Sequence, residues 1–202
     1  MIRAFLAVEL REETRSGLAQ LQQDLRKRLN QDLPREVRIS WVQPASIHLT
    51  MKFLGDIDEQ LVPSMQEEMG RTLQGYRSLS IPLKRLGAFP KALQPRVLWI
   101  GPAEGWEQGE DAQGLTAIHQ AIETCCRILD FAPENRPLSP HLTLARIREG
   151  ERQFGQVLAR SGVMDGPLAS EALVVGSIAL IKSDLKPTGS LYTRLWEVKL
   201  GE

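Results

Sequence analysis

The chain has 202 residues, and its 42% apolar content is ample for a packed hydrophobic core. Its 25 basic and 25 acidic residues cancel, which excludes strong long-range attraction of the whole molecule to nucleic acid or to an anionic membrane. Any recognition of an anion must therefore depend on local charge. No stretch approaches the ~18 apolar residues that suggest a membrane span, and the N-terminal segment is a poor signal peptide, so a cytoplasmic protein is expected.

In the first half of the chain, strand patterns alternate with amphipathic helix patterns. The elements expected there are, in chain order, a strand at 2–10, a helix at 18–29, strands at 38–42 and 47–54, a helix at 61–73, and strands at 78–86 and 96–101. The helices are indicated by apolar residues that recur at helical spacing. A stretch with glycine and proline at 87–95 joins the last two strands.

The second half repeats this rhythm. Its expected elements are a helix at 115–129, a proline-rich segment at 133–140, a strand at 141–147, a short helix at 152–159, and strands at 173–182 and 191–200 joined by a turn-rich segment at 183–190. Because helices interleave with strand pairs rather than with single strands, the pattern favours an α+β fold over a doubly wound parallel sheet. No long linker separates the halves, so we expect two similar lobes packed as one compact domain over residues 1–202.

The most distinctive pattern is a His-Leu-Thr motif that occurs twice, at residues 48–50 and 141–143. The match extends to a serine two residues before each histidine and to an apolar residue after each threonine. On a strand, residues two apart share a face, so each motif presents an imidazole beside a hydroxyl while its leucine points into a core. We expect the two pairs to face each other across a groove with approximate two-fold symmetry.

Two histidines and two threonines suit in-line displacement at phosphorus. One imidazole can activate the nucleophile and the other can protonate the leaving oxygen, because histidine titrates near pH 6.5. His48 and His141 are therefore candidate catalytic residues, and Thr50 and Thr143 are candidate donors to the non-bridging phosphate oxygens. The repeat by itself does not decide which histidine is the acid and which is the base.

A cation follows each motif. Lys52 has the strand parity of the first motif's histidine and threonine, so it is expected on the same face. Arg146 would point to the opposite face of a regular strand, and it reaches a phosphate only if the strand ends or bulges there. Phe89 and Trp99 are candidates either for stacking on a terminal base or for the core.

Competing chemistries have less support. A zinc site needs three or four protein ligands, and neither motif has Asp, Glu or Cys at close spacing, so no metal or other cofactor is expected. Cys125 and Cys126 are neighbours in an expected helix and are interpreted as reduced core residues rather than as nucleophiles. His119, which has no threonine two residues on, is interpreted as a surface or half-buried residue.

The motifs and the residues around them resemble the two-histidine phosphoesterase superfamily. The similarity is greatest to its RNA 2′,3′-cyclic phosphodiesterase branch, historically called 2′-5′ RNA ligase, and covers nearly the whole chain. The flanking residues that carry it are Trp41-Val42-x-Pro44, Lys52-Phe53-Leu54-Gly55, Phe89-Pro90, Pro95-Arg96-Val97-Leu98-Trp99 and Arg136-Pro137. The resemblance implies a bilobal α+β fold, with antiparallel sheets, helices on the outside and both histidines in a central cleft.

The resemblance also implies metal-independent hydrolysis of an RNA 2′,3′-cyclic phosphate to a 2′-phosphate. His141 would be the base that activates water and His48 the acid that protonates the 3′ oxygen, although the reverse assignment fits the symmetry equally well. The phosphate would be bound by Thr50, Thr143 and Arg146, and the candidate RNA contacts are Lys52, Phe89 and Arg136.

Two other functions fit the same motifs. They are reversible 2′-5′ ligation of tRNA halves and non-catalytic binding of RNA ends. In each case the partner would be an RNA end or a nucleoside cyclic phosphate. No membrane and no obligate protein partner are expected, and nothing in the sequence demands more than a monomer.

Overall fold

The computed structural model describes residues 1–134, 136–166, 168, 170–186 and 189–201. Its strands are β1 (Ile2–Glu9), β2 (Arg38–Trp41), β3 (His48–Ile57), β4 (Leu79–Ile81), β5 (Leu83–Phe89), β6 (Val97–Pro102), β7 (Leu142–Glu149), β8 (Leu173–Val175), β9 (Ser177–Lys186) and β10 (Gly189–Lys199). Its helices are α1 (Glu12–Asn30), α2 (Val62–Leu73), α3 (Glu110–Ile128) and α4 (Glu151–Ser161), with short 3-10 helices at Pro44–Ser46, Glu59–Leu61 and Trp106–Gln108.

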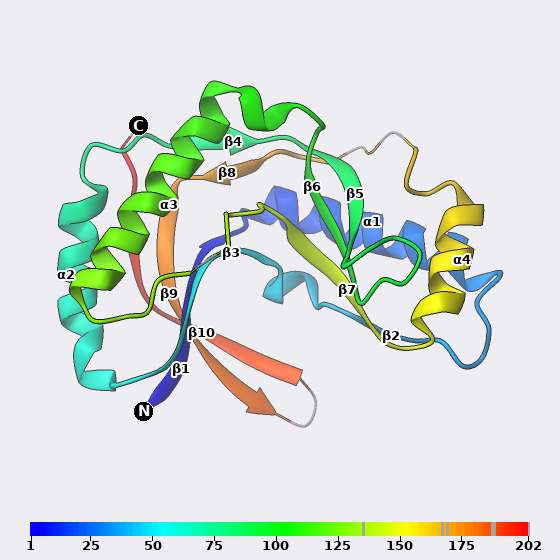
Figure 1. Ribbon diagram of the computed structural model, residues 1–202, viewed down its shortest axis with the longest axis horizontal. Coiled ribbons are helices and arrows are strands. Elements are labelled where there is room, and N and C mark those ends of the chain that lie inside the picture. Colours follow the sequence, from blue (N-terminus) through cyan, green and yellow to red (C-terminus); the bar gives the residue numbers. More distant parts are fainter. Residues whose placement is uncertain (135, 167, 169, 187–188, 202) are drawn as a thin grey trace.

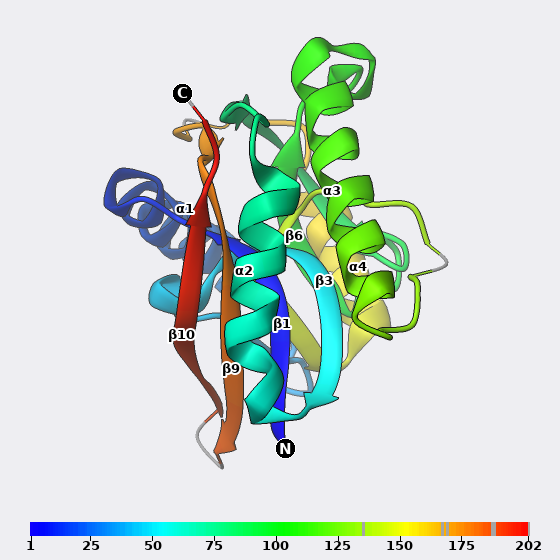
Figure 2. The same cartoon turned by 90° about the vertical axis from the view of Figure 1, so that its left-hand side faces the viewer.

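Two four-stranded antiparallel sheets form the framework (Figure 1). The first sheet has the strand order β10-β9-β1-β3, and the second has the order β2-β7-β6-β5. Strands β4 and β8 form a small sheet of their own. Helix α2 lies across the face of the first sheet with α3 beside it, whereas α1 and α4 accompany the second sheet (Figures 1 and 2). The expected α+β fold with antiparallel sheets and outer helices is confirmed.

The two sheets are not successive halves of the chain. Strands β2 and β3 are close neighbours in sequence, yet β2 pairs with β7 in the second sheet and β3 pairs with β1 in the first. The last two strands, β9 and β10, return to complete the first sheet beside β1. The first sheet therefore joins strands from both ends of the chain, the second is built from the part between them together with β2, and each receives one His-Leu-Thr motif.

Two strands expected to be continuous are divided. The strand at 78–86 is split at Pro82, which has no backbone N–H to donate, into β4 of the small sheet and β5 of the second sheet. The strand at 173–182 is split at Gly176 into β8 and β9. In the turn-rich segment expected at 183–190, β9 continues to Lys186 and β10 begins at Gly189, while residues 187 and 188 lie outside the described residues. Among the helices that the structure describes, none is long and apolar enough to cross a membrane.

Candidate active site

The two motifs reach a common cavity from different sheets. His48 begins β3 of the first sheet, and His141 directly precedes β7 of the second. The central leucines, Leu49 and Leu142, are 1% and 0% exposed, so each motif is anchored in the core on the opposite side of its strand. The cavity has a volume of about 460 Å³, and the candidate site residues among those lining it are His48, Thr50, His141, Thr143 and Arg146.

The backbone orients both imidazoles in the same way. Nδ1 of His48 lies 2.9 Å from the carbonyl oxygen of Ser46, and Nδ1 of His141 lies 2.7 Å from that of Ser139. A carbonyl can only accept a hydrogen bond, so Nδ1 carries the proton in each ring and donates it. In the neutral form of each histidine, Nε2 is therefore the nitrogen left to accept a proton. The serines that match in the two motifs contribute through their backbone carbonyls.

Aromatic rings fix the His48 side chain from strands that are remote in sequence. Phe5 of β1 stacks on the imidazole with a centroid distance of 4.7 Å, and Tyr192 of β10 meets it edge-on at 5.3 Å. Both aromatic residues also line the cavity. Sequence reasoning missed them because only the pairing of β3 with β1, and the return of β10 to the same sheet, bring them to the histidine.

His141 has aromatic neighbours of its own. Phe89 meets the imidazole edge-on with a centroid distance of 5.0 Å, and Trp99 lies 6.2 Å away. Trp99 is only 8% exposed, so of its two expected roles the structure favours the core. Phe89 is half-buried and lines a second cavity beside the first.

A β-bulge interrupts the strand three residues after each histidine. In β3 the bulge falls at Met51, which has no partner on β1 although both of its neighbours have one. In β7 it falls at Leu144, whose neighbours are likewise paired with β6. An extra residue on one strand reverses the alternation of faces beyond it. The residues that follow the bulges therefore face opposite to what a regular strand predicts.

The bulge in β7 turns Arg146 into the cavity, where its side chain is exposed. Gln22 of α1 supports this bulge: its side-chain amide donates to the carbonyl of Leu144 at 2.9 Å and to that of Val42 at 2.8 Å. Gln22 is only 2% exposed and was missed by sequence reasoning, because nothing in the helical pattern shows what a buried amide contacts.

The expectation that Lys52 shares the face of the first motif was wrong. The bulge at Met51 turns Lys52 away from the cavity, where it is 2% exposed and its Nζ lies 2.7 Å from Oε1 of Glu123. Phe53 takes the place expected for Lys52. It is 67% exposed and lines the cavity. This strand thus offers the site an aromatic ring instead of a cation.

A second cavity of about 540 Å³ adjoins the first. The two share Thr50, Phe53 and His141 in their linings. Of the candidate RNA contacts, Phe89 and Arg136 line this second cavity. The half-buried His119 also lines it, although the sequence indicated no role for this histidine.

Burial lowers the pKa of His48 below its ordinary value, and the nearby charges of Arg146 and His141 lower it further, whereas the hydrogen bond to Ser46 opposes the shift. Burial likewise lowers the pKa of His141; the hydrogen bond to Ser139 opposes this and Arg146 adds to it. Both imidazoles are therefore mainly neutral at pH 7 when the site is empty. An anion bound between them would favour protonation of one ring.

The cysteines and the possible metal ligands were also located in the structure. Cys125 and Cys126 are free and buried, and burial raises the pKa of the Cys126 thiol to about 12, which makes it a poor nucleophile. Among the described residues, His, Cys, Asp and Glu side chains nowhere form a group of three or more that could hold a metal ion.

Comparison with known proteins shows which proteins are similar to this chain in sequence. The chain matches the model of the LigT-like phosphoesterase family over residues 8–99 and 108–192. It is 28% identical over 192 residues to the RNA 2′,3′-cyclic phosphodiesterase of Methanothermobacter thermautotrophicus, covering 95% of each chain. It is 31% identical over 206 residues to the protein of that name from Thermus thermophilus, covering 98% of this chain and 90% of the relative.

Solved structures have the same fold. A crystal structure of a protein from Thermus thermophilus is 30% identical, aligns over 100% of both chains and has a TM-score of 0.67. Escherichia coli LigT in complex with 3′-AMP is 22% identical, aligns over 100% of this chain and 99% of that one, and has a TM-score of 0.73. Because the family match includes both His-Leu-Thr motifs and strands of both four-stranded sheets, the protein belongs to the LigT-like phosphoesterase family of the two-histidine superfamily.

Proposed function

We propose that the protein hydrolyses 2′,3′-cyclic phosphate ends of RNA to 2′-phosphate ends by acid–base catalysis with two histidines. The observation that carries the proposal is the meeting of His48 and His141, each with Nδ1 bound to a carbonyl, in one cavity that also holds Arg146. The relatives named RNA 2′,3′-cyclic phosphodiesterase, matched over nearly their whole length, support the choice of substrate.

The reaction is an in-line displacement at phosphorus. Nε2 of His141 accepts a proton from water as the water oxygen bonds to phosphorus, and the bond from phosphorus to the 3′ oxygen breaks. Nε2–H of His48 protonates that leaving oxygen, which yields a 2′-phosphate and a 3′ hydroxyl. Proton exchange with solvent then restores both rings. The opposite assignment balances equally well, and the choice of His141 as the base follows the family resemblance.

Charge that develops on the non-bridging oxygens is stabilised by groups on the same cavity. The hydroxyls of Thr50 and Thr143 lie on strands that converge there, and the guanidinium of Arg146 adds a positive charge. The positive charge of Arg146 is needed to attract the phosphate because the chain as a whole is formally neutral. No step in this proposal requires a metal ion.

The test is turnover of an oligoribonucleotide that ends in a 2′,3′-cyclic phosphate, measured in EDTA, with the product assigned as a 2′- or 3′-phosphate. His48→Asn and His141→Asn keep similar side-chain size but cannot transfer a proton at neutral pH, so each should reduce kcat by about 10²-fold or more. Thr50→Val should also reduce turnover, whereas Thr193→Val, at an exposed position on β10, is the matched control.

Full activity in both histidine variants would refute the proposal. Tight binding of the RNA end without any product would instead identify a non-catalytic binding module. Activity that EDTA abolishes and a divalent cation restores would show that the mechanism depends on a metal.

A further inference from the structure

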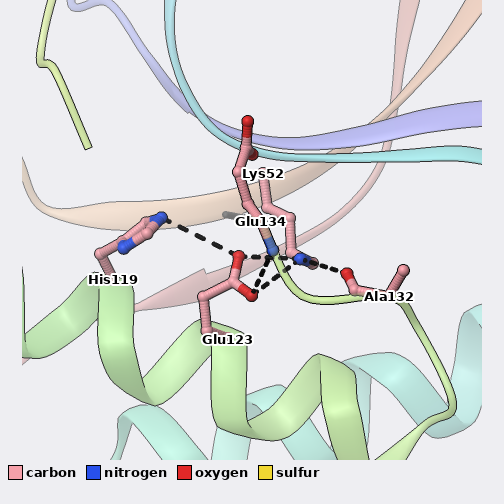
Figure 3. Close-up of polar contacts among 5 residues, drawn as sticks. All are labelled: Lys52, His119, Glu123, Ala132 and Glu134. Carbon is pink, nitrogen blue, oxygen red and sulfur yellow. Dashed lines mark hydrogen bonds and ion pairs between the residues drawn. The ribbon is translucent and has the colours of Figure 1, made fainter. Parts of the chain in front are cut away.

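Lys52, which the proposed chemistry does not use, is a buried cation with all of its donors satisfied (Figure 3). Its Nζ donates to Oε1 and Oε2 of Glu123 at 2.7 and 2.9 Å, and to the carbonyl oxygen of Ala132 at 2.9 Å. An ammonium group has three N–H donors, so these three acceptors define one orientation. The contacts join strand β3, which carries the first motif, to helix α3 and to the segment after it.

Glu123 holds the same segment at a second point. Its Oε2 accepts a hydrogen bond from the backbone N–H of Glu134 at 3.3 Å, and its side chain is 18% exposed. Its Oε1 lies 4.0 Å from Nε2 of His119 (Figure 3). Lys52 and Glu123 together therefore attach the backbone at Ala132 and Glu134, shortly after α3 ends.

The attached segment leads directly to the second motif. Ser139 supplies the carbonyl that binds Nδ1 of His141. Glu134 and residues 136–139 line the second cavity. Pro137 and Pro140 restrict the backbone close to the histidine, because their φ angles are fixed. A shift at 132–134 would therefore reach both the cavity wall and the approach to His141.

An ion pair whose lysine is buried is weak evidence for a purely stabilising role. Removing two charges from water is costly, and an apolar pair of similar volume often stabilises a protein as well or better. What the charged pair adds is a directed set of hydrogen bonds that specifies one geometry. In this protein the directed bonds end on the backbone of the segment that lines the cavity.

We propose that Lys52 and Glu123 are positioning residues that hold the segment before His141 and thereby shape the second cavity for the RNA end. This inference rests on the proposed function for its substrate. The attachment itself can be tested without turnover. Unlike a direct RNA contact, Lys52 acts through Glu123 and through the backbone of the segment.

The first test is hydrogen exchange of the intact protein. The variant Lys52→Met/Glu123→Met removes the pair and fills similar volume, and Arg38→Met/Glu149→Met removes an ion pair at exposed positions as the matched control. We expect faster exchange in peptides that cover 132–139 in the first variant only, with β3 and α3 unchanged. Unchanged exchange in that segment, or faster exchange throughout the protein, would overturn the inference.

The second test separates binding from chemistry with the cyclic-phosphate oligoribonucleotide. Lys52→Met/Glu123→Met should raise KM about tenfold because the cavity wall moves. It should change kcat less than about threefold, because His48 stays on β3 and His141 stays directly before β7 with Phe89 and Trp99 beside it. Glu123→Asp keeps the charge pair and shortens its reach, so it should raise KM less and provides a folded variant if the double substitution unfolds. An unchanged KM in both variants would contradict the inference.

The experiments distinguish failure of the proposed function from failure of the positioning role. An inactive wild-type protein would refute the hydrolysis proposal, and exchange at 132–139 would then decide by itself whether the pair holds the segment. An active wild type with unchanged KM in the variants would refute the positioning role and leave the hydrolysis proposal standing.

Discussion

Phe53 and Arg146 occupy equivalent places in the two motifs, each five residues after its histidine and each turned toward the cavity by the bulge before it. The two motifs supply the same residues, a histidine and a threonine, to the cavity. Phe53 and Arg146 break this symmetry because they differ in chemical type. One side of the cavity offers a guanidinium and the other an aromatic ring that is 67% exposed. This difference makes the two sides of the cavity chemically distinct, which under the proposed function would orient an RNA end.

Arg146→Gln should lower kcat/KM by about 10²-fold. The substitution removes a charge-assisted donor to the phosphate while it keeps a polar side chain of similar length. Steady-state kinetics on the cyclic-phosphate oligoribonucleotide measures the effect. Arg148→Gln is the control, because Arg148 is an exposed arginine on the same strand that does not line the cavity. Equal losses in the two variants would mean that general surface charge, and not the position of Arg146, supports activity.

The same substitution should raise the pKa of both active-site histidines. Burial is the main cause of their lowered pKa values, and the positive charge of Arg146 lowers both further. Removing that charge favours the protonated rings, so each pKa moves back toward 6.5. Titration of the imidazole protons by NMR provides the measurement, and in the wild-type protein both rings should titrate below 6.5. A fall in either pKa in Arg146→Gln would contradict the proposed geometry.

Phe53→Ala should raise KM for an RNA end by about tenfold, with little change in kcat. The reason is that an exposed ring beside the reacting groups offers a stacking surface to a base, and such stacking contributes about 1–3 kcal/mol. Leu93→Ala is a matched control, since Leu93 is also 67% exposed and lines neither of the two cavities. If Phe53→Trp binds no more tightly than Phe53→Ala, the stacking explanation is wrong.

Gln22→Met should destabilise the fold and reduce activity together. Its amide donates to the carbonyls of Leu144 and Val42, and methionine leaves both without that donor, at a cost of about 1–3 kcal/mol in the free energy of unfolding. The bulge that orients Arg146 would lose its support, so kcat/KM should fall as well. Urea unfolding and kinetics measure the two effects, with Gln23→Met, at an exposed position on α1, as the control. Loss of stability with full activity would show that the bulge holds its shape without Gln22.

The sequence by itself determined the type of fold and predicted the two histidines on which the proposed chemistry rests. The repeated motif is local, and alternation along a strand is enough to place Leu49 and Leu142 in the core. Apolar periodicity likewise identified most helices and strands, because burial on one face leaves a regular pattern along the chain. The α+β class followed from the order of those patterns.

Only the tertiary structure decided how the site is completed. Strand pairing brought Phe5 to His48, and helix packing brought Gln22 to the bulge at Leu144. The bulges left no local signal, since Met51 and Leu144 are ordinary apolar residues, yet they turned Lys52 inward and Arg146 toward the cavity. Such features depend on contacts between residues far apart in the chain, and periodicity along a single strand carries no information about its partners.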